Sequence, residues 1–202
     1  ESGYLSYHSQ ESQEEEDLLI SGSGAMYENR KRSGMSTPPV TGESSLKYFI
    51  DRMAAVKSAP YDEHILLVHN VCLKQDDIDA AKRVMNNVYW AICPLSNIFI
   101  HNALPPVPLM RENGLAITVG TDSLSSNDDL DMVKELVCIK HNFPEVPMNE
   151  ILVWACLNGA RFLSKEMQLG SLAPGKTPGI VFVSGVDEDG SFTYESRSER
   201  II

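Results

Sequence analysis

Continuous apolar runs alternate with amphipathic segments along most of the chain. Four runs are predicted to be strands: residues 4–7, 65–68, 88–93 and 115–119. Between and after them, apolar residues recur at helical spacing. We expect helices over residues 14–20, 25–31, 45–56, 75–86, 107–112, 128–141 and 148–163. Apolar strands joined by helices predict an α/β fold with a parallel sheet covered on both faces.

The last part of the chain has a different pattern. Turn residues such as Gly170, Pro174-Gly175 and Pro178-Gly179 precede a strand-like run at 180–183, a turn at 187–190 and a return strand at 192–194. We therefore expect two parts. Residues 1–168 hold about four β-α units with extra helices, half of a TIM-type (β/α)8 barrel. Residues 169–202 hold a small β structure.

Composition narrows the class of protein. The 202 residues are 43% hydrophobic and 22% charged, which predicts a packed core and excludes global disorder. The net charge of −11 argues against nonspecific binding to nucleic acid or to an anionic membrane. No apolar run approaches the ~20 residues needed to cross a bilayer, and no signal peptide opens the chain. The sequence favours a cytoplasmic protein with a small-molecule substrate.

The cysteines and the first residues add two expectations. None of Cys72, Cys93, Cys138 and Cys156 has CxxC spacing, which is typical of buried free thiols in a reducing compartment. The chain opens on Glu1-Ser2-Gly3 without Met, and a strand follows almost at once. We expect an upstream portion.

Polar residues end three of the apolar runs. His8 follows the first run and His69 the second, and Asp122 closes the fourth. A carboxylate at the mouth of a buried strand costs free energy unless a metal, a charge or hydrogen bonds receive it. Barrel enzymes collect their active sites from such strand ends, because the carboxyl ends of parallel strands share one edge. We expect these residues to meet.

Each residue also has an ordinary structural interpretation. His8, with Glu11 three residues on, is compatible with an exposed histidine beside an acidic helix start, whose charges we expect to be solvated. His69 is compatible with a hydrogen-bonded strand terminus, and Ser96-Asn97 with turn chemistry. Asp122 could cap a helix or organise a loop. The remaining histidines are expected away from the site: His64 at the far end of its strand, and His101 and His141 on the surface or in loops.

Four ordered segments resemble the C-terminal half of amidohydrolase-superfamily enzymes. They are His8-Ser9-Gln10-Glu11, Leu67-Val68-His69-Asn70, Cys93-Pro94-Leu95-Ser96-Asn97 and Val119-Gly120-Thr121-Asp122-Ser123. The resemblance is to the branch holding guanine, methylthioadenosine and S-adenosylhomocysteine deaminases and triazine chlorohydrolases. Residues 169–176 resemble the exit from that family's barrel into its small β-sandwich.

The resemblance implies roles for these residues. It places the strands as numbers five to eight of a barrel and makes His8 and Asp122 ligands of a divalent metal, zinc or iron. Glu11 would protonate the substrate ring, His69 would polarise substrate or water, and Asp122 would also shuttle the water's proton. Ser96, Asn97 and Ser123 would face the substrate.

One feature of the family is absent from the sequence. The family carries a His-x-His pair after its first strand, and this chain has none. A catalytic zinc normally has three or more protein ligands, and only two are expected here. We predict a fragment of a metal-dependent hydrolase that acts on non-peptide carbon–nitrogen bonds and deaminates an aminated heterocycle or purine-type substrate, inactive by itself. The alternatives are an inactive half-barrel that needs its missing N-terminal half or a homo-oligomer partner, and a dechlorinating or formimino hydrolase.

Overall fold

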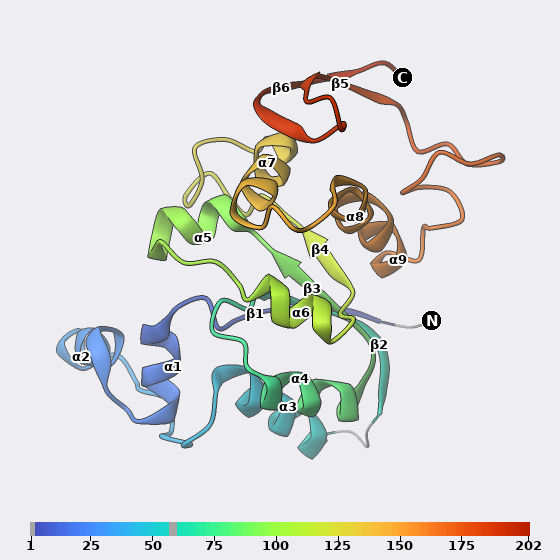
Figure 1. Cartoon of the computed structure of the whole chain (residues 1–202). Coiled ribbons are helices and arrows are strands. Elements are labelled where there is room, and N and C mark those ends of the chain that lie inside the picture. The colour runs from blue at the N-terminus through green and yellow to red at the C-terminus, as the bar shows by residue number, and fades with distance from the viewer. Residues whose placement is uncertain (1–2, 57–59) are drawn as a thin grey trace.

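Four parallel strands form the main sheet in the computed structural model, which describes residues 3–56 and 60–202 (Figure 1). They are β1 (Tyr4–Ser9), β2 (Tyr61–His69), β3 (Met85–Ile92) and β4 (Ile117–Val119). Each strand pairs with the next one along the chain, in the order β1-β2-β3-β4. This is the predicted α/β arrangement.

Helices fill the connections between the strands and follow β4. The segments at α1 (Gln13–Ile20), α2 (Gly24–Arg32), α3 (Ser45–Val56), α4 (Gln75–Val84), α6 (Val107–Glu112) and α7 (Met132–Asn142) confirm predicted helices. The predicted helix at 148–163 is α8 (Met148–Leu152), a π-helical stretch (Val153–Asn158) and α9 (Gly159–Phe162). Helix α5 (Pro94–His101) was not predicted.

The large core lies on one face of the sheet. Ile65 and Leu67 of β2 and Trp90 and Ile92 of β3 pack there with buried side chains of α3, α4, α6, α7 and α8. The alternate residues point to the other face, where Val68, Ala91 and Cys93 form a small separate cluster. On β1, that face carries the exposed Tyr4, Ser6 and His8. The expectation of a sheet covered on both faces is met only in part in the described part of the chain. Phe162 of α9 packs on this second face against Tyr4, His64 and Tyr89, whereas Ser6 and His8 of β1 stay exposed there.

The strand register brings the carboxyl ends together. His8 pairs with Val68, and Ser9 with His69. Val68 in turn pairs with Ala91, and Ile92 pairs with Val119. The segments that leave these strands therefore begin along one edge of the sheet.

Several predicted boundaries shift because tertiary contacts decide them. Residues 85 and 86 belong to β3 instead of α4, since Met85 and the following Asn87 pair with Tyr61 and His64 of β2. Leu130 was predicted on the buried side of a helix but is 55% exposed. Helix α7 begins only at Met132, where the Asp131 side chain caps it by accepting a hydrogen bond from the Val133 N–H.

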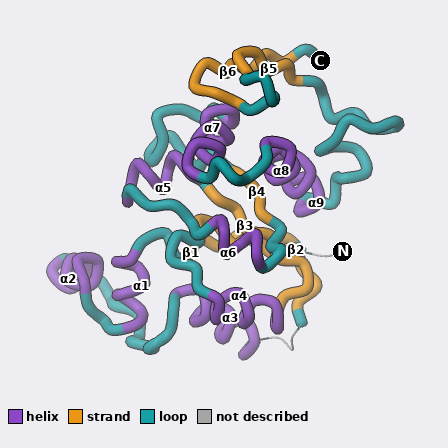
Figure 2. The backbone as a smooth tube through the Cα atoms, in the orientation of Figure 1, coloured by secondary structure: helices purple, strands orange, loops and turns teal. Residues whose placement is uncertain are grey.

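The predicted terminal hairpin is present. Strands β5 (Val181–Val186) and β6 (Phe192–Arg200) are antiparallel, and β6 lies against α7 (Figure 1). Figure 2 shows loop throughout the chain between α9 and β5. The division of the chain at residues 168 and 169 stays a prediction.

The cysteine expectation holds in part. All four thiols are free, but only Cys93 and Cys138 are buried, while Cys72 is half-buried and Cys156 is exposed. Among the described residues no helix is long and apolar enough to cross a membrane. Glu1 and Ser2, from which we expected an upstream portion, lie outside the described residues.

Candidate active site

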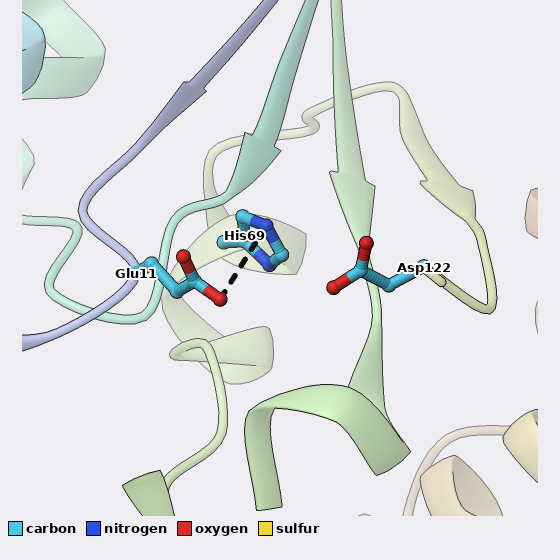
Figure 3. Close-up of side chains that lie close together, drawn as sticks. All are labelled: Glu11, His69 and Asp122. Carbon is cyan, nitrogen blue, oxygen red and sulfur yellow. Dashed lines mark ion pairs between the residues drawn. The ribbon is translucent and has the colours of Figure 1, made fainter. Parts of the chain in front are cut away.

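Three predicted site residues converge at the carboxyl ends of the strands. Glu11 follows β1, His69 ends β2 and Asp122 follows β4, and their side chains point toward one another (Figure 3). One ligand atom from each lies within 4.8 Å of the other two. The Glu11 Oε1 and His69 Nε2 atoms are 3.7 Å apart. Of the residues that we expected to meet, the structure brings His69 and Asp122 together, and Glu11 joins them.

The backbone turns sharply where these side chains are presented. His69, Asn70 and Asp122 have left-handed φ values of 75°, 57° and 57°, and Gln10 has 56°. Such conformations cost a non-glycine residue on the order of 1–3 kcal/mol and persist where the surroundings enforce them. Strain of this kind gathers at functional sites.

Glu11 is held from the acidic helix that follows it. Its backbone N–H donates to Glu15 Oε2 at 3.0 Å, while the Glu15 N–H donates to the N-cap hydroxyl of Ser12. Glu16 is 1% exposed and accepts the Ser45 N–H at 3.0 Å. The expectation of a wholly solvated acidic run is therefore wrong at Glu16, which anchors the segment that begins α3.

His69 is buried and oriented by a residue of α5. Its Nδ1 lies 3.2 Å from the Asn97 side-chain amide nitrogen. Because an amide N–H can only donate, Nδ1 accepts, and neutral His69 carries its proton on Nε2, facing Glu11. Burial lowers the pKa of His69 against the opposing charges of Glu11 and Asp122, which favours the neutral ring.

Asp122 is held as a carboxylate by two serine hydroxyls. Ser96 and Ser126 both donate to its Oδ2, at 2.7 and 2.6 Å. Partial burial raises the pKa of Asp122, but these hydrogen bonds and the nearby His69 outweigh it and hold the pKa below its usual value. The resemblance implies that Ser96 and Asn97 face the substrate, and ordinary turn chemistry was the alternative. Both are fully buried in α5, where they contact Asp122 and His69.

The remaining histidines and Ser123 lie outside the group of three. His8 is exposed on β1, with its ring centroid 5.4 Å from that of His69. Ser123 is exposed in the loop after Asp122. His64 lies at the other end of β2, where its Nδ1 approaches the Phe162 carbonyl at 2.5 Å. His141 is exposed as expected, though on α7, and His101 is half-buried at the end of α5.

Sequence reasoning missed Ser126, Asn127 and Glu135. Glu135 lies on α7, is 0% exposed and has a pKa raised to about 7 by burial. The signal in the sequence is a glutamate set among Val133, Leu136 and Val137, all of which are buried.

The donor atoms fit a divalent metal in kind. Imidazole nitrogen and carboxylate oxygen are common zinc ligands, and a zinc site needs at least three protein ligands. Glu11, His69 and Asp122 are close enough together to offer three such atoms, whereas the expected ligand His8 is beside His69 and outside this group.

Comparison with known proteins identifies the family. Residues 40–202 match the amidohydrolase family. A 5-methylthioadenosine/S-adenosylhomocysteine deaminase from Moorella thermoacetica is 36% identical over 129 residues, 60% of this chain and 30% of that protein. The crystal structure of Helicobacter pylori aminofutalosine deaminase aligns with a TM-score of 0.71 at 27% identity, over 87% of this chain and 43% of that one. A zinc-bound adenosine deaminase from Xanthomonas campestris shares the fold, with a TM-score of 0.61 at 24% identity over 88% of this chain and 36% of that one.

The chain spans 30% of the length of that curated relative and less than half of each of these solved structures. The family match extends from the loop before α3 through the terminal hairpin, and the fold matches part of the related barrel structures. The chain belongs to the amidohydrolase family.

Proposed function

We propose that this chain is the C-terminal half of a metal-dependent amidohydrolase that deaminates a purine-type amine. The observation that carries the proposal is the convergence of Glu11, His69 and Asp122 at one edge of the sheet. The names of the relatives support the substrate class, since the relatives from Moorella and Helicobacter are both deaminases.

The residues divide the chemistry among them. Asp122, a carboxylate kept ionised by Ser96 and Ser126, accepts the proton of the attacking water. Glu11, 32% exposed at the mouth of the site, donates a proton to the substrate ring nitrogen so that the amine can leave. His69 presents its Nε2–H to the charge that develops during attack.

A divalent metal, zinc or iron, belongs to this proposal. His8 and Asp122 would hold it, together with ligands from outside this chain. Glu11 and His69 are assigned to proton transfer and charge stabilisation in this proposal, so this chain supplies two ligands, fewer than a zinc site needs. When bound, the metal would lower the pKa of its water to about 7. Ser123, exposed beside Asp122, is proposed to contact the substrate together with Ser96 and Asn97.

The test is to express the chain together with the N-terminal half of a related barrel that carries a His-x-His pair. We expect ammonia release from 5′-substituted adenosines, and we expect Glu11→Gln and Asp122→Asn each to lower kcat by roughly 10²–10⁴-fold. Glu14→Gln is the matched control, because Glu14 is exposed in the same acidic run. Equal activity of Glu11→Gln and the parent would contradict the role of Glu11, and absence of turnover in the assembled parent would contradict the function.

An inactive half-barrel is the second candidate, and one observation favours it. The face of β1 that carries Tyr4, Ser6 and His8 is exposed, as expected of a sheet that needs a partner. That partner would be an N-terminal half-barrel or a second copy of the chain.

Dechlorination or formimino hydrolysis remains the alternative reaction. Glu11 favours deamination because protonation of the ring nitrogen helps an amine leave.

A further inference from the structure

Glu135 joins two segments that hold the candidate active site, and its hydrogen bonds go to Leu95 and Asn127. One carboxylate oxygen, Oε2, accepts the Leu95 backbone N–H at 2.9 Å. The other, Oε1, accepts from the Asn127 side chain at 2.8 Å. Glu135 itself is 0% exposed on α7. Both of its oxygens therefore accept hydrogen bonds from other segments, one from α5 and one from the loop after β4.

The Leu95 connection leads to α5. Leu95 lies in the first turn of this eight-residue helix, where backbone N–H groups have no partner within the helix and a negative charge is favourable. The next two residues are Ser96, which donates to Asp122, and Asn97, which orients His69. Glu135 thus fixes the helix turn from which both contacts are made.

The Asn127 connection leads to the loop around Asp122. The same Asn127 amide nitrogen that donates to Glu135 also donates to the Thr121 carbonyl at 2.9 Å. Thr121 immediately precedes Asp122, whose φ is 57°. Ser126, the neighbour of Asn127, donates to the Asp122 carboxylate. The loop therefore closes around Asp122 and is tied to α7 at Glu135.

We propose that Glu135 is a positioning residue that sets the geometry of His69 and Asp122 together, through Leu95 and Asn127. The inference rests on the proposed function only for the roles of His69 and Asp122. The structural coupling can be tested without turnover.

Glu135→Gln is the sharpest variant, because a glutamine offers one acceptor where two donors must be received. If its oxygen faces Leu95, its NH₂ faces the Asn127 NH₂. If Asn127 flips to accept that NH₂, the Thr121 carbonyl loses its donor. Either way, one of the two connections breaks while the side-chain volume is kept.

The experiment is NMR on the 202-residue chain with ¹⁵N-labelled histidine, together with amide hydrogen exchange. For Glu135→Gln we expect a mixture of His69 tautomers, and exchange of the Leu95 or Ser126 amide at least tenfold faster relative to the strand amides of β2. Val137→Ala is the control, since it truncates a buried residue of the same helix that joins neither connection. It should leave the His69 tautomer unchanged.

The proposal is overturned if Glu135→Gln keeps the parent's tautomer and relative protection, or if Val137→Ala alters them equally. Should Glu135→Gln not fold, Asn127→Ala decides the question. It removes only one connection, so the Asp122 backbone shifts should move while the His69 tautomer stays, and unchanged Asp122 shifts would refute the proposal. A folded, correctly coupled chain without deaminase activity after assembly would instead count against the proposed function.

Discussion

The ionisation of Asp122 depends on two hydroxyl groups that the sequence separates by thirty positions. Ser96 and Ser126 converge on one carboxylate oxygen, from α5 and from the loop after β4. Hydrogen bonds to a carboxylate stabilise its charged form and lower its pKa. The pKa of Asp122 is thus lowered by two serines, of which only Ser96 was predicted from the sequence to be a site residue.

We predict that replacing both serines by alanine raises the pKa of Asp122. In the parent, the folded pKa lies below the ordinary value of 3.8, so Asp122 stabilises the fold above that pH and the contribution is lost as pH falls through the folded pKa. The double variant should lose about 1–2 kcal/mol of its free energy of unfolding at pH 7. As the pH falls, its free energy of unfolding should decline less than the parent's. Urea unfolding between pH 2.5 and 7, with ¹³C NMR of the carboxylate, measures both effects.

Ser125→Ala is the matched control for this pair, because Ser125 lies in the same loop and is exposed. Its Asp122 titration should follow the parent's. A double variant with an unchanged or lower pKa at Asp122 would show that the hydroxyls do not set it.

At the scale of elements, the edge of β4 is protected by the helical segment that follows α8. Strand β4 is three residues long, and the Asn158 side chain donates to its Ile117 carbonyl at 2.7 Å. Asn158 ends a π-helical stretch, a rare geometry that is common near functional sites. This hydrogen bond covers part of an edge at which no fifth strand pairs in the described sheet.

We predict that Asn158→Ala lowers the free energy of unfolding by about 1–3 kcal/mol, because it leaves a buried carbonyl without its donor. Urea denaturation with an unchanged m-value would report the loss. Asn149→Ala, an exposed site at the start of α8, should cost less than about 0.5 kcal/mol. Equal effects of the two substitutions would contradict a specific role for Asn158 at the edge.

At the scale of the whole molecule, the proposed metal site needs ligands from the N-terminal half of a barrel. The chain contributes His8 and Asp122 as expected ligands, and no His-x-His sequence occurs in it. We predict that the isolated chain binds zinc at least 100-fold more weakly than the chain assembled with an N-terminal half-barrel carrying that pair, because a zinc site needs three or more ligands. Equilibrium dialysis with metal analysis measures the difference.

Asp122→Asn should weaken zinc binding in the assembled form, whereas Asp128→Asn, at an exposed residue of the same loop, should not. Tight stoichiometric zinc in the isolated chain would contradict the incomplete site and the inactive half-barrel alike.

Much of the fold could be predicted because the residues that are buried and paired in the sheet are largely those in the continuous apolar runs of the sequence. The continuous apolar runs became the strands, and the four strand-end motifs identified the amidohydrolase family. The prediction was wrong where tertiary contacts outweigh pattern: at residues 85 and 86, which belong to β3, and at Leu130, which precedes the capped start of α7. Helix α5, which holds Ser96 and Asn97, was not predicted.

The sequence by itself determined the order of the strands, the residues that follow them and the family, because these depend on periodicity and on motifs of adjacent residues. Only the tertiary structure decided which side chains meet. It left His8 beside the group of Glu11, His69 and Asp122, and it placed the distant Glu135 behind them as a buried acceptor. The physical reason is that hydrogen-bond partners and burial depend on packing between segments far apart in the chain, which no local pattern records.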